Sequence, residues 1–311
     1  MNGVRILDRD QTRAGLDPLR VLDAVAAALV ALSRGEVSAP PRIAAMAPAG
    51  LLGAMPAYVP GLGLAAKLVS VFAAPGQPGR STHRGIVALY DEHDGAPVAL
   101  LDAEPLTAVR TAASATLSMR ALAPDPARIA VLGAGVQARA QLELLAALGV
   151  DVPVTVGGRD PDRVAALVAD HPFATAAGIE AAVRGADVVF CCTGAREPLF
   201  PRAWLADGAH VSSVGGSHGS EVDAATIAES ALFAEWPGAA AAPPPAGAYE
   251  LQSVDPARVV LLGSVLDGRH PGRGDGLSVY KSTGHAALDV AAAAVVHAWA
   301  VAGGVGTVLG R

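Results

Sequence analysis

The sequence predicts an α/β protein in which a doubly wound parallel sheet is joined to a discontinuous domain of mixed α and β structure. From residue 128 onward, short apolar runs alternate with helical segments, which is typical of a parallel sheet covered by helices. Residues 43–101 contain short apolar runs broken by glycine and proline, which is typical of an antiparallel sheet. A long alanine-rich segment near the C-terminus is expected to pack back on the first domain. We therefore expect residues 1–120 and 285–311 to form one domain and residues 121–284 the other.

The composition excludes several classes of protein. The 23 basic and 29 acidic residues give a net charge of −6, which argues against a nucleic-acid partner. Apolar residues make up 52% of the 311 residues, enough for a buried core and too many for a disordered chain. The two cysteines, Cys191 and Cys192, are adjacent, which excludes a disulfide scaffold and a structural zinc site. We expect both to lie in the core, on opposite faces of one strand, and we expect no metal.

No targeting segment is visible. Charged residues precede the first apolar run, so the sequence shows no signal peptide. The longest apolar stretch follows Asp289 and is interrupted by His297, whereas a membrane-spanning helix needs about 20 uninterrupted apolar residues. We therefore expect a cytoplasmic protein without a membrane segment, and a buried helix over residues 284–301.

Local signals place the elements of the first domain. Asp17-Pro18 supplies the N-cap and first turn of a helix over residues 17–33, and Gly35 follows its last turn. The pair Asp94-Gly95 between two apolar runs predicts a hairpin. A second helix carries Arg110 and ends before Pro124. The expected strands cover residues 51–55, 64–72, 85–90 and 98–102, and the second helix covers residues 106–122.

The second domain is predicted from its alternating pattern. Asp160-Pro161 begins one of its helices. Residues 238–247, with three consecutive prolines, are expected to form a loop or the edge of a lid, and the chain is expected to leave the sheet near Leu277. The expected strands cover residues 128–133, 152–156, 173–176, 187–192 and 210–214, and a helix is expected over residues 136–148.

A glycine pattern, Gly133-x-Gly135-x-x-Ala138, lies between the first of these strands and the helix that follows it. Glycines at this place allow a tight turn and let the backbone approach a pyrophosphate, and the start of the helix offers N–H groups and positive partial charge. In this strand–loop–helix context the pattern predicts a Rossmann-type dinucleotide-binding domain.

The end of the second strand bears on the choice between NAD and NADP. An acidic residue there binds the ribose 2′-hydroxyl of NAD, whereas an arginine accommodates a 2′-phosphate. The sequence reads Val156-Gly157-Gly158-Arg159-Asp160. Asp160 is better explained as a helix cap before proline, although its role as the ribose acid remains the alternative. We therefore expect NADP(H) to be preferred over NAD(H).

Only two of the 23 basic residues are lysines, Lys67 and Lys281. Lysine differs from arginine at sites that need a compact, titratable ammonium group. The two positions are therefore candidates for a function that arginine does not supply, with chance survival as the alternative.

Several stretches beyond the glycine loop form a pattern when they are taken in order. They are Gly53-Ala-Met-Pro-Ala-Tyr58, Lys67-Leu-Val-Ser-Val-Phe72, Ala108-Val-Arg-Thr-Ala-Ala113, Gly133-Ala-Gly-Val-Gln-Ala138, Gly208-Ala-His-Val-Ser-Ser-Val-Gly-Gly-Ser217 and Val279-Tyr-Lys-Ser-Thr-Gly284. Together they cover nearly the whole chain, and together they resemble the ornithine cyclodeaminase and mu-crystallin family.

The resemblance implies a homodimer whose first domain forms the dimerising sheet, a nicotinamide cofactor, and an amino-acid or cyclic imino-acid substrate. By position, Arg42, Lys67 and Arg110 match the family residues that hold the substrate carboxylate, and Met55 is a further candidate for substrate binding. Positions 135–137 match the pyrophosphate loop, and positions 193, 214 and 282 match the nicotinamide side. The candidate cofactor-binding residues are Arg110, Thr111, Gly133, Gly135, Val136, Gln137, Gly158, Arg159, Thr193, Val214, Gly215 and Ser282.

At one place the chain departs from the cyclodeaminases, which carry an aspartate after the Gly-Gly pair. Here Ser217 stands at that position, followed by His218, and the mu-crystallin branch also has a serine there. A serine is not an anionic base near neutral pH, so direct deamination of ornithine is disfavoured. Reduction of a ready-made C=N bond needs a hydride donor, a carboxylate clamp and one proton, for which Lys67, Ser217 and His218 are the catalytic candidates.

Three hypotheses follow for the function. The first is an NAD(P)H-dependent reductase of cyclic or linear ketimine acids, such as 1-pyrroline-2-carboxylate or 1-piperideine-2-carboxylate, or the reverse amino-acid dehydrogenase. The second is an ornithine or lysine cyclodeaminase with bound NAD, and the third is an NADPH-dependent ligand-binding protein. A dehydrogenase that condenses an amine with a keto acid also stays open. The three basic residues expected at the carboxylate favour the first hypothesis.

Overall fold

The computed structural model describes residues 3–72, 83–215 and 219–310, and the chain divides into two compact units. Unit 1 comprises residues 1–110 and 285–311, and unit 2 comprises residues 111–284. The later boundary coincides with the expected one, whereas the earlier boundary falls inside helix α3 (Ala103–Leu122) and not at residue 120. Helix α3 contributes to both units. Near its start Thr107 accepts a hydrogen bond from Lys67 of unit 1, whereas near its end Ser118 is hydrogen-bonded to His210 of unit 2.

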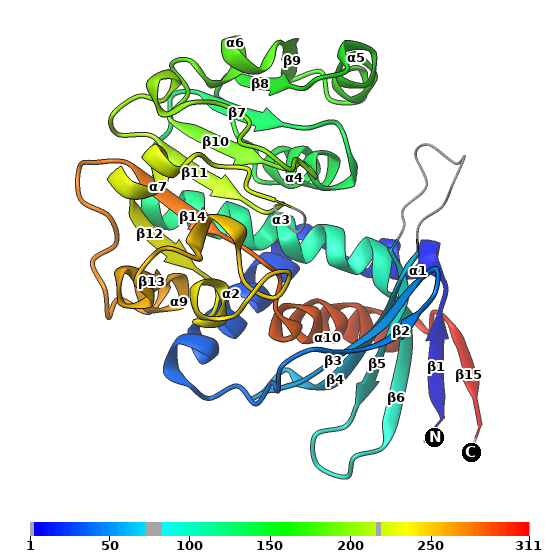
Figure 1. Ribbon diagram of the computed structural model, residues 1–311. Coiled ribbons are helices and arrows are strands. Elements are labelled where there is room, and N and C mark those ends of the chain that lie inside the picture. The colour runs from blue at the N-terminus through cyan, green and yellow to red at the C-terminus, as the bar shows by residue number, and fades with distance from the viewer. Residues whose placement is uncertain (1–2, 73–82, 216–218, 311) are drawn as a thin grey trace. The chain divides into compact units, whose positions relative to one another are not determined.

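Unit 2 contains a fully parallel sheet with the strand order β13-β12-β14-β11-β10-β7-β8-β9 in the described part of the chain (Figure 1). The order reverses between β7 and β10, which is the switch point of a doubly wound fold and confirms the predicted fold class. The strands are β7 (Ile129–Leu132), β8 (Val154–Gly157), β9 (Ala174–Ala177), β10 (Val188–Cys191), β11 (His210–Ser213), β12 (Ala231–Ala234), β13 (Val259–Leu261) and β14 (Ser278–Lys281).

Helices cover this sheet because its short strands are apolar on both faces. Two hydrophobic clusters lie on opposite sides of β7 and β10, and Cys191 belongs to one while Cys192 belongs to the other. Both cysteines are buried, so the prediction that they face opposite sides of the core is confirmed. The helices are α4 (Val136–Ala147), α5 (Pro161–Ala169), α6 (Ile179–Val183), α7 (Ala224–Glu229), α8 (Gly238–Ala241) and α9 (Leu262–Leu266).

Two predictions for unit 2 were wrong. The chain does not leave the sheet near Leu277, because the next four residues form β14, a buried strand between β12 and β11. Residues 238–247 are not a simple loop or lid edge: the first four form the short helix α8, and Ala239 and Ala240 are buried in the core.

Unit 1 contains a mainly antiparallel sheet with the order β15-β1-β6-β5-β4-β3-β2 in the described residues (Figure 1). The predicted antiparallel sheet and the hairpin at Gly95 are confirmed, since β5 and β6 pair antiparallel around it. The N-terminal β1 and C-terminal β15 pair side by side and were not predicted. The strands are β1 (Val4–Leu7), β2 (Ile43–Ala47), β3 (Gly50–Val59), β4 (Gly63–Phe72), β5 (His83–Tyr90), β6 (Pro97–Asp102) and β15 (Thr307–Leu309).

One face of this sheet is covered by α10 (Ala286–Gly303), which also packs against α2 (Pro18–Arg34) and α1 (Arg9–Gly15). Asp17 caps α2, and Gly35 ends it in the left-handed conformation, as predicted. By length and composition α10 is apolar enough to cross a membrane, but 56% of it is buried inside the fold and it carries Asp289. We therefore interpret α10 as the core helix of unit 1.

Candidate functional site

The first candidate site lies in unit 1, where two buried cations share one carboxylate. Lys67 Nζ donates to Asp289 Oδ1 at 3.3 Å, and Arg110 Nε donates to the same oxygen at 3.0 Å. Lys67 Nζ also donates to Thr107 Oγ1 at 2.8 Å. Lys67 is 6% exposed, Arg110 5% and Asp289 2%. Charged side chains are almost never this buried unless they are paired, and here the two cations are paired with one carboxylate.

The alternation of strand residues aims Lys67 at the helix. Lys67 lies near the middle of β4, opposite Met55 on β3 and Val87 on β5, and cross-strand partners share a face of the sheet. That face is the one covered by α10, whose first turn carries Asp289. His285 caps α10: its Nδ1 accepts a hydrogen bond from the N–H of Ala287 at 3.2 Å.

The surroundings of Lys67 change its pKa and the pKa values of its neighbours. Burial lowers the pKa of Lys67 to about 8; the Asp289 charge opposes this shift, and the Arg110 and Arg42 charges add to it. Burial raises the pKa of Asp289, but Lys67 and Arg110 outweigh burial, and the pKa lies below its usual range. Burial lowers the pKa of His285 to about 4. At neutral pH the cluster therefore holds more positive than negative charge, as a site for an organic acid requires.

The structure brings the predicted substrate-binding residues of unit 1 together. Arg42 directly precedes β2 and is half-buried, and its charge acts on both Lys67 and His285. Met55 is half-buried beside Lys67 in the β3–β4 register. Sequence reasoning missed Asp289, although it had a signal: it is the only charged residue in the alanine-rich helix α10. Its Oδ2 atom is buried without a hydrogen-bond partner among the described residues.

The second candidate site is the glycine loop of unit 2. Gly133 has φ +120°, and a Cβ there would lie 2.6 Å from the carbonyl oxygen of Cys192. Only glycine fits this close approach of two backbones. Gly135 is the N-cap of α4, and among the described residues a Cβ there would meet no atom within 4 Å. The first N–H groups of α4 also have no side-chain cap in this part of the chain, so the loop fits a pyrophosphate.

Val136 and Gln137 begin α4 directly after this loop, where a phosphate group would contact the helix N-terminus. Val136 is exposed, and the Gln137 side-chain oxygen is buried without a hydrogen-bond partner among the described residues. Thr111 is buried within α3.

Two arginines lie close to the end of β8, one in the turn after the strand and one in the first turn of helix α5. Arg159 is exposed next to Gly158, and Asp160 Oδ1 accepts a hydrogen bond from the N–H of Arg163 at 3.1 Å. Asp160 is therefore the N-cap of α5, which confirms the favoured interpretation of this residue. Arg163 was not predicted, yet its Nη2 lies 3.4 Å from the carbonyl oxygen of Ala134 in the glycine loop.

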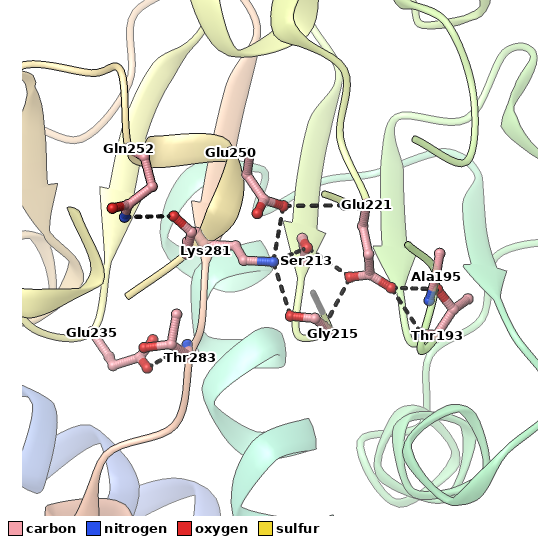
Figure 2. A network of polar contacts seen from close by, with 11 residues as sticks. Thr193, Ala195, Ser213, Gly215, Glu221, Glu235, Glu250, Gln252, Lys281 and Thr283 are labelled. Carbon is pink, nitrogen blue, oxygen red and sulfur yellow. Dashed lines mark hydrogen bonds and ion pairs between the residues drawn. The ribbon is translucent and has the colours of Figure 1, made fainter. Parts of the chain in front are cut away.

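The carboxyl ends of β10, β11 and β14 carry Thr193, Val214, Gly215 and Ser282, which the sequence analysis assigned to cofactor binding. Figure 2 shows that buried charged groups hold this edge: Glu221 bonds to Thr193 and Gly215, and Lys281 bonds to Gly215. In open α/β sheets ligands bind at this edge. The predicted catalytic residues Ser217 and His218 lie outside the described residues.

A parallel sheet with a glycine loop at its switch point, together with a buried cluster of basic residues in a second unit, defines a Rossmann-type α/β protein equipped for an acidic ligand. A model of the ornithine cyclodeaminase/mu-crystallin family matches residues 8–304, and the chain belongs to this family.

Named relatives narrow the comparison. The mouse (Mus musculus) ketimine reductase mu-crystallin is 30% identical over 254 residues, with 80% of each chain covered. The Delta(1)-pyrroline-2-carboxylate/Delta(1)-piperideine-2-carboxylate reductase of Azospirillum brasilense is 32% identical over 300 residues, with 94% of each chain covered. A solved structure of Thermococcus litoralis Delta(1)-pyrroline-2-carboxylate reductase, in complex with NADH and L-proline, has a TM-score of 0.86 at 25% identity, covering 98% of this chain and 99% of that one.

Proposed function

We propose that the protein is an NAD(P)H-dependent reductase of imino acids, with cyclic ketimine acids such as 1-pyrroline-2-carboxylate and 1-piperideine-2-carboxylate as substrates. The observation that carries the proposal is the buried cluster of Lys67, Arg110 and Asp289 in unit 1. It combines an excess of positive charge, which suits a carboxylate, with an ammonium group whose pKa is about 8. The names of the three relatives specify substrates or products of this same class.

In the proposed mechanism the two arginines bind and Lys67 transfers the proton. Arg110, with Arg42 near it, holds the substrate carboxylate, since a guanidinium group matches a carboxylate in two places. This contact orients the C=N bond. Thr107 and Asp289 aim Lys67 Nζ, which donates its proton to the imine nitrogen. When bound, the reduced nicotinamide supplies the hydride that the imine carbon takes up. In the reverse direction, amino-acid oxidation, neutral Lys67 accepts the proton.

For the cofactor we propose NADP(H) in preference to NAD(H). Arg159 lies in the turn after β8 and Arg163 in the first turn of α5, at the position where the adenosine ribose of a Rossmann cofactor lies. The acid that directly follows Arg159, Asp160, is occupied as the cap of α5, and Asp162 lies in the first turn of that helix. Two exposed arginines, with no acid directly at the end of β8, favour a 2′-phosphate over a 2′-hydroxyl.

We also propose that the protein is a homodimer that pairs through the sheet of unit 1. The face opposite α10 carries Ile43, Leu52 and Ile86, which are 69%, 49% and 42% exposed. The β-ladder places these three side chains on one face, across β2, β3 and β5. An apolar sheet face of this kind is typical of an interaction surface, and a second copy of the same face is its simplest complement.

Oxidation of NADPH and of NADH, followed in parallel with the two cyclic imino acids, tests the function. We expect turnover with wild type, preferring NADPH, and loss of at least about 100-fold in kcat/KM in Lys67→Ala, the scale of a lost general acid. If Lys67→Ala still binds NADPH, its loss of activity lies in the catalytic step and not in cofactor binding. Absence of cofactor oxidation in wild type would contradict the proposal, and conversion of ornithine to proline without net cofactor change would identify a cyclodeaminase instead.

A further inference from the structure

Three neighbouring strands of unit 2 end in a cluster of buried charged side chains that the proposed reaction does not use. The cluster consists of Glu221, Glu250 and Lys281, which are 0%, 8% and 1% exposed. It lies at the carboxyl ends of β10, β11 and β14, which are adjacent in the sheet. Figure 2 shows Lys281 between Glu250 and the end of β11, with Glu221 on the other side of that strand end.

Glu221 ties together the residues that follow two of these strands. Its Oε1 accepts hydrogen bonds from the N–H and the hydroxyl of Thr193, at 2.9 and 2.5 Å. Its Oε2 accepts from the hydroxyl of Ser213 and the N–H of Gly215, at 2.7 and 2.9 Å. Because all four partners donate, Glu221 acts here as a carboxylate, and both of its oxygens are satisfied.

Lys281, the last residue of β14, is hydrogen-bonded to the end of β11. Its Nζ donates to Ser213 Oγ at 2.8 Å and to the carbonyl oxygen of Gly215 at 2.9 Å. Glu250 Oε1 lies 3.0 Å from the same nitrogen and also accepts from the N–H of Glu221 at 3.3 Å. Gly215 is thus held at both its N–H and its carbonyl oxygen.

Only glycine fits at position 215. A Cβ at this position would lie 2.0 Å from the carbonyl oxygen of Thr193 and 2.5 Å from Glu221 Oε1. The segments after the two strands therefore approach too closely for a side chain at position 215, and the carboxylate of Glu221 accepts from an N–H group of each. Burying three charges costs folding free energy that apolar side chains would not, so fold stability alone does not explain the cluster.

We propose that Glu221, Lys281 and Glu250 are positioning residues that hold Thr193 and Gly215 in the conformation that receives the nicotinamide end of the cofactor. The assignment of this edge to the nicotinamide rests on the proposed function. The three residues act through the backbone of the strand ends and do not themselves take part in the chemistry. The fixed edge places the ring before it reacts, which is the role of a rigid supporting shell around a site.

Binding of two related ligands tests the proposal without any imino acid. We would measure dissociation constants of NADPH and of 2′-phospho-ADP-ribose, which lacks only the nicotinamide, and in parallel of NADH and ADP-ribose. In Glu221→Gln the amide cannot accept from all four donors, so we expect the affinity for NADPH to fall about tenfold or more, the scale of a lost charge-assisted hydrogen bond. The affinity for 2′-phospho-ADP-ribose should change less than about twofold, since its contacts lie elsewhere.

Matched variants separate positioning from general damage to the fold. Asp187→Asn is the control, because Asp187 accepts two backbone N–H groups, of Ala127 and Arg128, at the opposite end of β10. We expect it to leave both affinities unchanged. If Glu221→Gln does not fold, Ser213→Ala removes one donor to Glu221 and one acceptor of Lys281, and we expect the same selective loss at smaller size.

The outcomes are distinguishable. Equal weakening of both ligands in the variants, or unchanged NADPH affinity, would overturn the positioning role. Wild-type protein that binds neither ligand pair would overturn the proposed cofactor instead. Selective loss of the nicotinamide-containing ligand, with Asp187→Asn unaffected, would establish the positioning role whatever the imino-acid assay shows.

Discussion

The protonation state of Lys67 depends on a few neighbouring groups whose effects on its pKa oppose one another. Burial and the charges of Arg110 and Arg42 favour the neutral amine, whereas Asp289 favours the ammonium. His285 also faces the cluster, but burial lowers its pKa to about 4, so it is neutral near pH 7 and adds no charge. Asp289 is therefore the one group that keeps Lys67 protonated where an imine needs a proton.

The residue-scale prediction concerns Asp289→Asn. The protonated form of Lys67 is the active one for imine reduction, so kcat/KM falls as pH rises through the pKa of about 8. Removal of the anion 3.3 Å from Nζ lowers that pKa further, by about one unit. We expect the alkaline limb of the kcat/KM profile to move to lower pH by that amount.

Asp10→Asn, a change in an exposed first-turn acid of α1, is the control and should leave the limb in place. A limb that stays or moves upward in Asp289→Asn would contradict the role assigned to Asp289.

Residue identity could be predicted from the sequence where a motif carried it. Lys67 and Arg110 were found by their stretches, and the structure places them on one carboxylate oxygen. Asp289 could not be found this way because it is 222 positions from Lys67, and only the fold of α10 onto β4 joins them. Arg163 was missed for a similar reason: its contact is with a loop 29 residues earlier.

Among the elements, the turn from β8 into α5 decides the choice of cofactor. A helix start prefers an acidic cap, and Asp160 serves that need. The acid that would select NAD is thereby withdrawn from the ribose, while Arg159 and Arg163 stand on either side of it in the sequence.

The element-scale prediction therefore concerns Arg159→Ser and Arg163→Ser. Each change removes a charged donor for a 2′-phosphate, so we expect KM for NADPH to rise about tenfold, the scale of a lost hydrogen bond of roughly 1.5 kcal/mol. KM for NADH should change little, because NADH lacks the phosphate. Steady-state kinetics with both cofactors checks this, and Arg184→Ser, whose arginine pairs with Glu180 on α6, is the control. A parallel rise of KM for NADH would refute the phosphate contact.

Three of the shortest strands that the sequence did not predict share a physical cause. β1, β13 and β15 have three or four residues each, too few to show a periodicity, and pairing with neighbours stabilises them. β14 was hidden because its residues Val279 and Tyr280 lie in a stretch that was interpreted as a motif and not as a strand. Where capping signals were present the prediction was close: α2 was predicted to within one residue at each end, and the start of α5 was predicted at Asp160-Pro161.

On the scale of the whole molecule, the chain returns to its first unit. Its ends meet in one sheet, where β1 pairs with β15, and α10 then covers one face of that sheet. The alanine-rich composition of α10 suggested this return, since so apolar a helix needs a core to bury it. The opposite face of the sheet has no comparable cover among the described residues, and its exposed isoleucine and leucine side chains leave it suited to a partner.

The last prediction tests whether that partner is a second copy. Leu52 lies on the exposed face of β3, and Leu52→Asp places a charge where two apolar faces would meet. Burial of an unpaired charge costs several kcal/mol, so we expect the dimer to dissociate to a monomer of 31.0 kDa at micromolar concentration. Sedimentation velocity or light scattering measures the mass directly.

Val301→Asp, at an equally exposed apolar position on α10, is the control and should leave the mass of the dimer unchanged. A wild-type monomer, or a Leu52→Asp protein that keeps the dimer mass, would show that this face does not form the interface. Circular dichroism and thermal unfolding check that unit 1, which carries Leu52, stays folded in the variant.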